Sequence, residues 1–507
     1  MRRIVFLFIL LASPAIAKAQ NRSLDGAAAT ITESDVARRI RIIADDSMMG
    51  RDTPSRGLEL TAQYVADEFK RFGLTPGGEN GTWFQRYNVM RARLNPAASH
   101  VGFMAAGSHL HAELSRDARY LYGGIPAGEV GGPAIIFSGT WDTTTTLGEQ
   151  VKDRVALVVI DRSQGPMPEN GSRLLRALIQ ARPKGIVVVS NRDSATFATE
   201  IGRTSNPRLS LEGMQSSSVP VVEVHQRAIG DLLRQAGVDL SALRGSAAWT
   251  QKDLPGLTVM IDLEQEVIER VSAPNTIGLL EGTDPKLKAE FLVFSAHMDH
   301  IGISSGQADS INNGADDDGS GTVGVVELAE AFSQARPRRS VLFITVSGEE
   351  KGLWGSQYFS EHPTVPIANV VADLNIDMIG RNWKDTIVAI GKEHSNLGTT
   401  LNRVNQSHPE LRMNAIDDRW PQENFYFRSD HYNFARKGVP ILFFFNGTHP
   451  DYHRPSDSPD KIDAEKESRI LKLLFFLGQD IANATARPTW NPESYKQIVE
   501  GNGGRAR

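Results

Sequence analysis

The sequence predicts an α/β protein with two folded parts, a larger open-sheet domain and a smaller α/β unit. Apolar runs of strand length alternate with helical stretches from about residue 270 to 487, which is typical of an open α/β sheet. Residues 126–250 differ from this pattern, because their apolar runs are shorter and rich in β-branched residues. The length of 507 residues also exceeds that of one ordinary domain, which favours more than one folded unit.

Two amphipathic helices are predicted near the N-terminus. Apolar residues recur at helical spacing in 33–46 and again in 56–74, and Gly73 follows the second run where a C-terminal cap is expected. Between them, residues 48–57 (MMGRDTPSRG) are rich in turn-forming residues. We therefore expect an exposed loop there.

The smaller unit is predicted to contain four strands and two helices. The strands correspond to GGPAIIFSG, RVALVVIDR, KGIVVVSN and SVPVVEV, and the helices to RLLRALIQARP and QRAIGDLLRQAG. No cluster of His, Asp and Glu lies in this segment. We expect it to cover the active domain or face the substrate, without chemistry of its own.

Four nearly continuous apolar runs in the larger domain suit central strands that are buried on both faces. They span 291–296, 340–347, 370–376 and 439–445. The composition, 40% hydrophobic and 23% charged, is that of an ordinary globular protein and excludes a disordered or collagen-like chain.

The chain contains no cysteine, so disulfides, thiolate nucleophiles and cysteine-ligated metal sites are excluded. Any metal must be held by His, Asp and Glu. The formal charge of -5, from 60 acids and 55 bases, gives no basic excess for a polyanion, so we expect no nucleic-acid partner.

Residues 1–19 are typical of a secretory signal peptide. Arg2 and Arg3 precede the short apolar run IVFLFILLASPAIA, and Ala17-Lys18-Ala19 resembles a cleavage site. The run is shorter than the ~20 residues of a spanning helix and contains Pro14. We therefore expect an exported protein, periplasmic or secreted, that is free of the membrane after cleavage.

Charged residues and histidines follow each of the four buried strands. Because ligands bind outside the carboxyl ends of strands in open α/β sheets, these side chains are candidates for one site. Singly, each has a structural explanation, such as a hydrogen-bonded His or a helix-capping Asp. Their joint occurrence at one sheet edge favours a functional site, made of His297, Asp299, Asp316 to Asp318, Glu349, Glu350, Asp377 and His453.

The ordered motifs HMD, GADDDGSG, GEE, NIDM, RSDHYNF and YHRPSD resemble those of exported bacterial dizinc aminopeptidases. The resemblance implies a zinc-exopeptidase fold of the phosphorylase/hydrolase-like type, three-layer α/β/α with a mixed central sheet. It also implies a protease-associated (PA) insertion. The expected domains are a signal peptide (1–19), a helical lead-in of the peptidase domain (20–125), a PA-like insertion (126–252), the catalytic domain (253–487) and a tail (488–507).

By this resemblance, Asp317 bridges two Zn²⁺ ions per subunit. One ion takes His297 and Asp377, and the other takes Glu350 and His453. Three carboxylates and a bridging hydroxide would neutralise the four positive charges of two zinc ions. Imidazoles and carboxylates are the expected ligands of catalytic zinc.

The resemblance also suggests roles for the neighbouring residues. Glu349 is the expected general base that deprotonates the bridging water. Asp299 lies two residues after His297, on the same face of an extended strand, and can orient its imidazole. Tyr452 is a candidate to donate a hydrogen bond to the negative oxygen that develops on the attacked carbonyl, or else a packing residue. Asp430 and His431 are expected to support the pocket rather than bind metal.

The function implied is metal-assisted hydrolysis of peptides, by an aminopeptidase that removes N-terminal residues. The same fold leaves open a carboxypeptidase, a dipeptidase or a glutaminyl cyclase. A further alternative is a catalytically inactive receptor or binding module, which we would expect to have lost ligands that are all present here.

Overall fold

The computed structural model describes residues 23–105, 107–142, 145–163, 165–201, 206–213, 219–306 and 308–501. The predicted signal peptide, residues 1–19, lies outside the described residues. The chain divides into two compact units, one formed by the N-terminal segment to Tyr87 together with Ser272 onward, and the other by Asn88–Val271.

The larger unit is built on a mixed sheet. Four neighbouring strands run parallel, and they coincide with the four apolar runs that predicted buried strands: β13 (Phe291–His297), β14 (Ser340–Val346), β15 (Val370–Ile376) and β18 (Ile441–Phe444). Antiparallel strands flank them, β12 (Gln265–Leu280) beside β14 and β16 (Thr386–Ile390) beside β18. The prediction of an open α/β sheet is confirmed.

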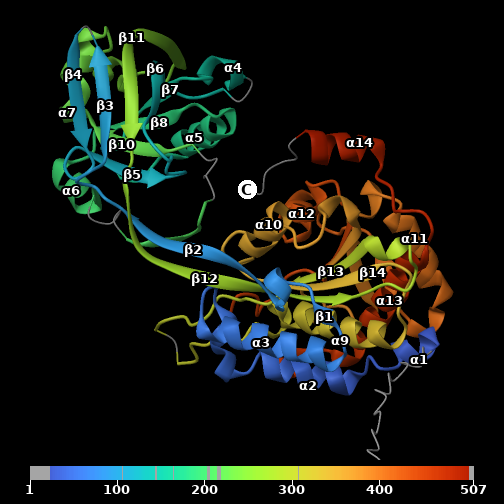
Figure 1. The fold of residues 1–507 in the computed structure, drawn as a ribbon. Helices are drawn as coiled ribbons and strands as arrows, with labels where there is room; N and C mark the ends of the chain where they lie inside the picture. The colour runs from blue at the N-terminus through green and yellow to red at the C-terminus, as the bar shows by residue number, and fades with distance from the viewer. Residues whose placement is uncertain are drawn as a thin grey trace, which may run out of the picture. The chain divides into compact units, whose positions relative to one another are not determined.

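Helices cover both faces of this sheet, which makes three layers (Figure 1). One apolar core contains residues of the sheet and of α1 (Leu24–Ala28), α2 (Glu33–Ile43), α3 (Arg56–Arg71), α9 (Gly321–Gln334), α11 (Leu397–Ser407) and α13 (Ala464–Asn483). On the other face, a second core contains residues of α10 (Trp354–Glu361) and α12 (His431–Ala435). The two predicted N-terminal helices correspond to α2 and α3.

The end of the described chain packs onto this unit. Trp490 contributes to the second core, and its indole N–H donates to the carbonyl of Gly438 at 2.8 Å. The short helix α14 (Pro492–Tyr495) follows. Part of the predicted tail is therefore ordered on the larger unit.

The smaller unit contains an eight-stranded sheet in the order β4-β3-β11-β6-β7-β8-β10-β5. Its four parallel strands are the predicted ones, β6 (Val130–Ser138), β7 (Val155–Ile160), β8 (Gly185–Ser190) and β10 (Val221–His225). The predicted helices are α5 (Glu169–Ala181) and α7 (Gln226–Gln235).

The boundaries of the smaller unit differ from those predicted. It begins at Asn88 and ends at Val271, whereas the sequence suggested 126–252. Residues assigned to a helical lead-in form all of β2 (Phe84–Leu94), β3 (His100–Ala105), β4 (Ser108–Glu113) and β5 (Ala118–Tyr122). These strands are short or partly exposed, so they lack the continuous apolar runs that reveal buried strands. At the end of the smaller unit, β11 (Thr250–Asp262) and β12 lead the chain back to the larger unit.

The prediction that residues 48–57 form an exposed loop is wrong for the middle of this segment. Gly50, Arg51 and Thr53 are fully or almost fully buried, and the segment packs beside the loop that follows β13. Turn-forming residues indicate a change of chain direction, but they do not reveal what covers the turn.

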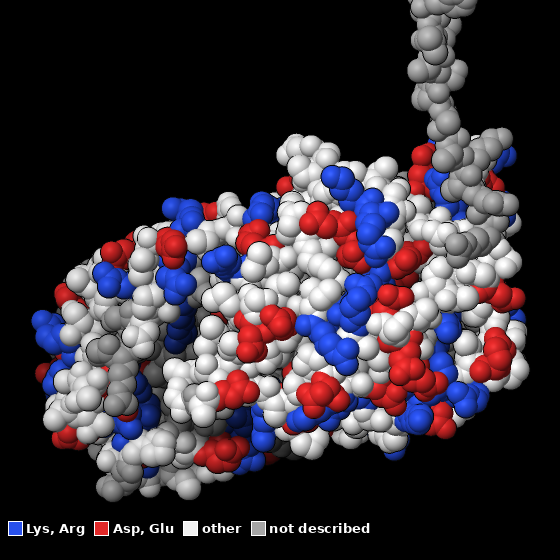
Figure 2. Space-filling view, turned by 90° about the horizontal axis from the view of Figure 1, so that it is seen from below, with Lys and Arg blue, Asp and Glu red and all other residues white. Residues whose placement is uncertain are grey.

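Acidic and basic side chains are intermixed on the face shown in Figure 2. Ion pairs on α2 and α3, Arg38 with Asp35 and Arg71 with Glu68, are examples of such mixed surface charge. Among the described residues, no helix has the length and apolarity needed to span a membrane.

Candidate metal centre and active site

The parallel strands bring the predicted site residues to one edge of the sheet. His297 is the last residue of β13, and Asp377 directly follows β15. Glu349 and Glu350 lie in the loop after β14, and His453 lies in the long loop after β18. Asp317 lies in the tight turn before α9. All five predicted metal ligands are brought together.

The carboxylate of Asp317 lies between two imidazoles. Its Oδ1 is 3.4 Å from Nε2 of His297, and its Oδ2 is 3.1 Å from Nε2 of His453. Nε2 of His297 is also 3.7 Å from Oδ1 of Asp377, and Nε2 of His453 is 3.2 Å from Oε2 of Glu350. Two groups of donors therefore share one carboxylate.

The neighbours of Asp317 are occupied by other contacts. Oδ1 of Asp318 accepts from the main-chain N–H groups of Gly321 and Met378, and its Oδ2 accepts from that of His297. Oδ1 of Asp316 accepts from the N–H of Gly380 at 2.7 Å. Both side chains hold the backbone around the site, and a carboxylate oxygen of Asp318 also lies close to donor atoms of His297 and Asp377.

The donor set fits a divalent cation. Asp317 Oδ2 and Glu350 Oε1 are buried and make no hydrogen bond of good geometry to the described residues, although each faces an imidazole. Glu349 and Asp377 line the same small cavity as Asp317. Several buried carboxylates close together repel one another, and a cation held by imidazole and carboxylate donors removes that cost. Such a set is typical of zinc sites.

The adjacent glutamates face different surroundings. Glu350 lies against His453, whereas Glu349 lines a small cavity of about 60 Å³ together with His297, Asp317, Asp377 and Tyr452. Burial raises the pKa of Glu349 well above its usual range, and the charges of Asp430 and Glu350 add to this effect. Glu349 is therefore the glutamate of the pair that can exchange a proton with a molecule in this cavity.

Asp299 connects the loops after β13 and β14. Its Oδ1 accepts from the main-chain N–H of Glu349 at 3.2 Å, and its Oδ2 accepts from the hydroxyl of Thr53 at 3.0 Å. Nδ1 of His297 lies 3.1 Å from the main-chain carbonyl of Asp299 and 3.7 Å from its carboxylate. Asp299 therefore contacts His297 mainly through its backbone, and its carboxylate positions Glu349.

Tyr452 lines the same small cavity, and its ring stacks on His453 with centroids 3.8 Å apart. Burial raises the pKa of its hydroxyl above the usual value, so the group stays protonated and able to donate.

The two residues predicted to support the pocket are buried. Burial raises the pKa of Asp430 to about 7. Nε2 of His431 lies 2.7 Å from the carbonyl of Tyr426, and its ring stacks on Phe443. Burial lowers the pKa of His431 to about 3, so this residue is neutral. Neither belongs to the groups of converging donors.

Several residues around the site were missed in the sequence. Arg51 is fully buried and donates to the carbonyls of Met298, Asn313 and Gly314. It thereby ties the loop after β13 to the turn that carries Asp317. No local pattern distinguishes Arg51 from an exposed loop arginine.

Asp457 and His300 were missed as well. The carboxylate of Asp457 accepts from the N–H groups of Asp316 and Asp317, at 3.0 and 3.1 Å. His300 lies 2.9 Å from Glu350 through its Nδ1. Their positions in YHRPSD and HMDH were the only signal in the sequence.

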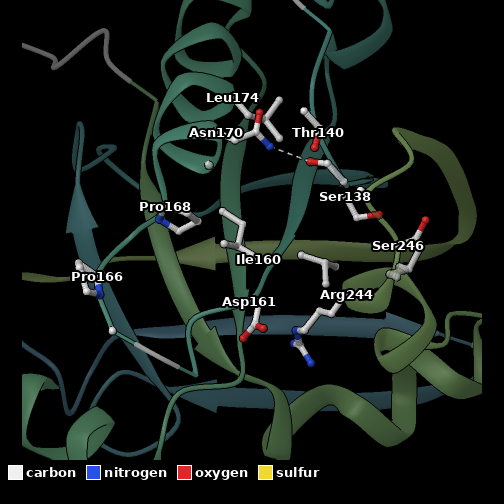
Figure 3. A pocket seen from close by; sticks show the side chains of 16 residues that line it. Ser138, Thr140, Ile160, Asp161, Pro166, Pro168, Asn170, Leu174, Arg244 and Ser246 are labelled. Atoms are coloured by element: carbon white, nitrogen blue, oxygen red, sulfur yellow. Dashed lines mark hydrogen bonds between the residues drawn. The ribbon is translucent and has the colours of Figure 1, made fainter.

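A larger cavity, of about 410 Å³, lies in the smaller unit at the ends of β6 and β7 and the start of α5 (Figure 3). Asn170 donates to the carbonyl of Gly139 at 2.9 Å there, and Asp161 and Arg244 line the opposite side. It contains none of the predicted site residues. The predicted residues His297, Asp317, Glu349, Asp377 and Tyr452 line the smaller cavity instead.

Residues 275–477 match the model of Peptidase family M28. A "Probable leucine aminopeptidase" of Trichophyton verrucosum is 24% identical over 326 residues, 61% of this chain and 85% of that protein. A "Probable zinc metalloprotease" of Pyricularia oryzae is 36% identical over 272 residues, 43% of this chain and 53% of that protein.

The aminopeptidase from Aneurinibacillus sp. strain AM-1 is similar in fold. Its TM-score is 0.50 at 17% identity, over 93% of this chain and 98% of that chain. The match of residues 275–477 to the M28 model and the donor set of imidazoles and carboxylates support a zinc-dependent peptidase. This chain is a hydrolase of peptide bonds, and the matched span 275–477 carries all five predicted metal ligands.

Proposed function

We propose that this metallopeptidase is an exported bacterial aminopeptidase, which holds two zinc ions per subunit and removes N-terminal residues from peptides. The observation that carries the proposal is the carboxylate of Asp317, whose oxygens lie 3.4 and 3.1 Å from the imidazoles of His297 and His453. In the proposal, His297 and Asp377 hold one ion and Glu350 and His453 hold the other, with Asp317 shared.

The zinc pair, when bound, supplies Lewis acidity that polarises the scissile carbonyl and acidifies water. Glu349 takes the proton of the attacking water and later delivers it to the leaving amine, because its carboxyl group lines the cavity together with His297, Asp317 and Asp377. Asp299 holds the backbone of Glu349 through the bond to its N–H. Tyr452 donates its hydroxyl to the developing oxyanion.

The cavity favours substrates whose first side chain is apolar. Its lining includes the rings of Phe425, Phe443 and Phe445 together with the carboxylates of Asp317, Glu349 and Asp377. Aromatic rings bind apolar side chains by excluding water from both surfaces. The buried carboxylates suit a positively charged α-amino group, which supports an aminopeptidase.

One residue favours a second candidate, a carboxypeptidase or dipeptidase. Arg428 lines the same cavity, half-exposed, with its guanidinium over the ring of Phe425. An arginine at the rim could pair with a substrate carboxylate. The aminopeptidase proposal expects Arg428→Gln to leave the cleavage of aminoacyl amides nearly unchanged, since these substrates have no terminal carboxylate.

We further propose that residues 88–271 form a PA-like insertion and that residues 1–19 direct export to the periplasm or medium. The insertion proposal is supported by the parallel strands β6, β7, β8 and β10, which lie between two segments of the peptidase unit in the chain. The export proposal depends on the charged start, the short apolar run and Ala17-Lys18-Ala19.

The experiment is a substrate screen of aminoacyl amides, N-blocked amides and C-terminal dipeptides, with and without a chelator. The proposal expects cleavage of free-amine substrates, loss of activity with chelator and recovery with zinc. Cleavage that requires a free carboxylate would establish the second candidate. Cleavage that survives complete removal of metal would contradict both.

A further inference from the structure

His300 is a buried histidine with no assigned role. It lies one residue after Asp299, in the loop that leaves β13, and no part of it is exposed to solvent. Neither of its ring nitrogens makes a hydrogen bond of good geometry to the described residues, and its Nδ1 contacts only the carboxylates of Glu350 and Asp317. A buried imidazole that faces two carboxylates without a well-formed hydrogen bond suits a shared cation between them.

The ring nitrogen Nδ1 of His300 points into one of the two donor groups. It lies 2.9 Å from Oε1 of Glu350 and 3.6 Å from Oδ2 of Asp317. The same Oδ2 lies 3.1 Å from Nε2 of His453. One donor atom from each of these four residues lies within 4.8 Å of the others.

The surrounding backbone fixes this ring. A Cβ at Gly314 would lie 2.6 Å from the His300 ring, so only glycine leaves room for it. Arg51 donates to the carbonyl of Gly314 at 2.8 Å, and its own carbonyl accepts from the N–H of His300. The imidazole is therefore held against Glu350 by the same arginine that positions the Asp317 turn.

We propose that His300 is a further ligand of the metal ion held by Glu350 and His453. This inference rests on the proposed zinc site. With Asp317 it gives that ion four protein donors, His300, Asp317, Glu350 and His453, whereas the other ion has His297, Asp317 and Asp377. A neutral imidazole is a common zinc ligand and adds no charge to the site.

The two ions then differ in how they are held. Zinc with four protein donors is typical of a tightly bound ion, and three donors leave a position open for water or substrate. The ligands of the three-donor side, His297 and Asp377, line the small cavity with Glu349, but Glu350 and His453 do not line it. The ion on the His300 side is thus the tight one, and the ion on the His297 side faces the substrate.

The test measures zinc binding directly. Wild-type protein, His300→Ala and His300→Gln are compared for zinc per chain, for dissociation constants by competition with a chromophoric chelator, and for the absorption spectrum after Co²⁺ substitution. His225→Gln is the matched control, because His225 is also buried but lies in the smaller unit. Circular dichroism establishes that each variant is folded, and His300→Gln serves if the alanine variant is not.

We expect two zinc ions in the wild type, and a loss of affinity for the tighter one of about tenfold or more in either His300 variant. The cobalt spectrum should change in these variants and stay unchanged in His225→Gln. A folded His300 variant with wild-type zinc constants and cobalt spectrum overturns the inference while leaving the zinc site intact. A wild type that binds no zinc overturns the proposed function itself, and with it this inference.

Discussion

The main-chain N–H of Glu349 donates to the carboxylate of Asp299 at 3.2 Å. The two residues are on loops that follow neighbouring parallel strands, β13 and β14. The other carboxylate oxygen of Asp299 is held by Thr53, which also accepts from the N–H of Gly348. Through these bonds a residue of the N-terminal segment fixes the loop that carries the proposed base.

Substitution of Asp299 tests this positioning role. Asp299→Ala should lower kcat by about 10- to 100-fold with little change in KM, because Glu349 loses its anchor while the cavity remains. Asp299→Asn keeps an oxygen that can accept from the Glu349 N–H and should retain more activity. The measurements are kcat, KM and the pH–rate profile. Equal losses in the two variants would contradict the positioning role.

Glu349→Gln tests the proposed base itself. Since a positioned general base contributes about 10²- to 10⁴-fold, kcat should fall by that order, with zinc content unchanged. Glu393→Gln is the control, because Glu393 is mostly exposed and follows β16, which runs antiparallel to β18 and so ends at the opposite edge of the sheet. The role is wrong if a folded, zinc-loaded Glu349→Gln variant turns over at nearly the normal rate.

Arg51→Met should destabilise the peptidase unit. The change leaves buried carbonyls of Met298, Asn313 and Gly314 without their donor, and each lost partner costs about 1–3 kcal/mol. We expect the free energy of unfolding to fall by about 3 kcal/mol or more. Urea denaturation of the chelated protein measures it, with Arg38→Gln on the surface of α2 expected within about 0.5 kcal/mol of wild type. Equal stabilities of the Arg51 variant and wild type would contradict the buried role.

His431 should make stability depend on pH. Its pKa is lowered by burial to about 3, against about 6.5 in an unfolded chain. Above pH 6.5 neither state binds the proton, so the contribution of His431 is constant. As pH falls from 6.5 towards 3, the unfolded state takes up a proton and the folded state does not. The free energy of unfolding therefore falls by about 1.4 kcal/mol per pH unit in this window.

His431→Gln removes this dependence. Between pH 7 and pH 5, wild type should lose about 2 kcal/mol more stability than the variant, measured by urea denaturation with chelator in both samples. Chelator removes the separate effect of pH on metal binding. The same loss in both proteins would show that His431 does not titrate as its burial implies.

The sequence predicted the parts of this structure that depend on local pattern. Strands β13, β14, β15 and β18 are buried on both faces and therefore read as continuous apolar runs. Strands β3 and β4 lie in the smaller unit without such runs, so its start was placed too late in the chain.

Site residues that lie in a motif directly after a strand were predictable from the sequence. Those that act through hydrogen bonds to residues far away in the sequence were not. Arg51 reaches carbonyls that are more than 240 residues away in sequence, and Thr53 reaches Asp299 over a similar separation. His300 is only three residues from His297, yet the loop turns the two rings towards different donor groups. Local spacing contains no information on such contacts.

The central claim is that the carboxylate of Asp317 is shared by two metal ions. Metal analysis of Asp317→Ala tests this claim most directly. Zinc per chain is measured after dialysis for wild type, Asp317→Ala and Asp377→Ala, with folding checked by circular dichroism. We predict two ions in wild type, loss of one ion in Asp377→Ala, and weaker binding of both ions in Asp317→Ala, because only Asp317 contacts both donor groups. A folded Asp317→Ala variant that still holds two zinc ions would contradict the shared site.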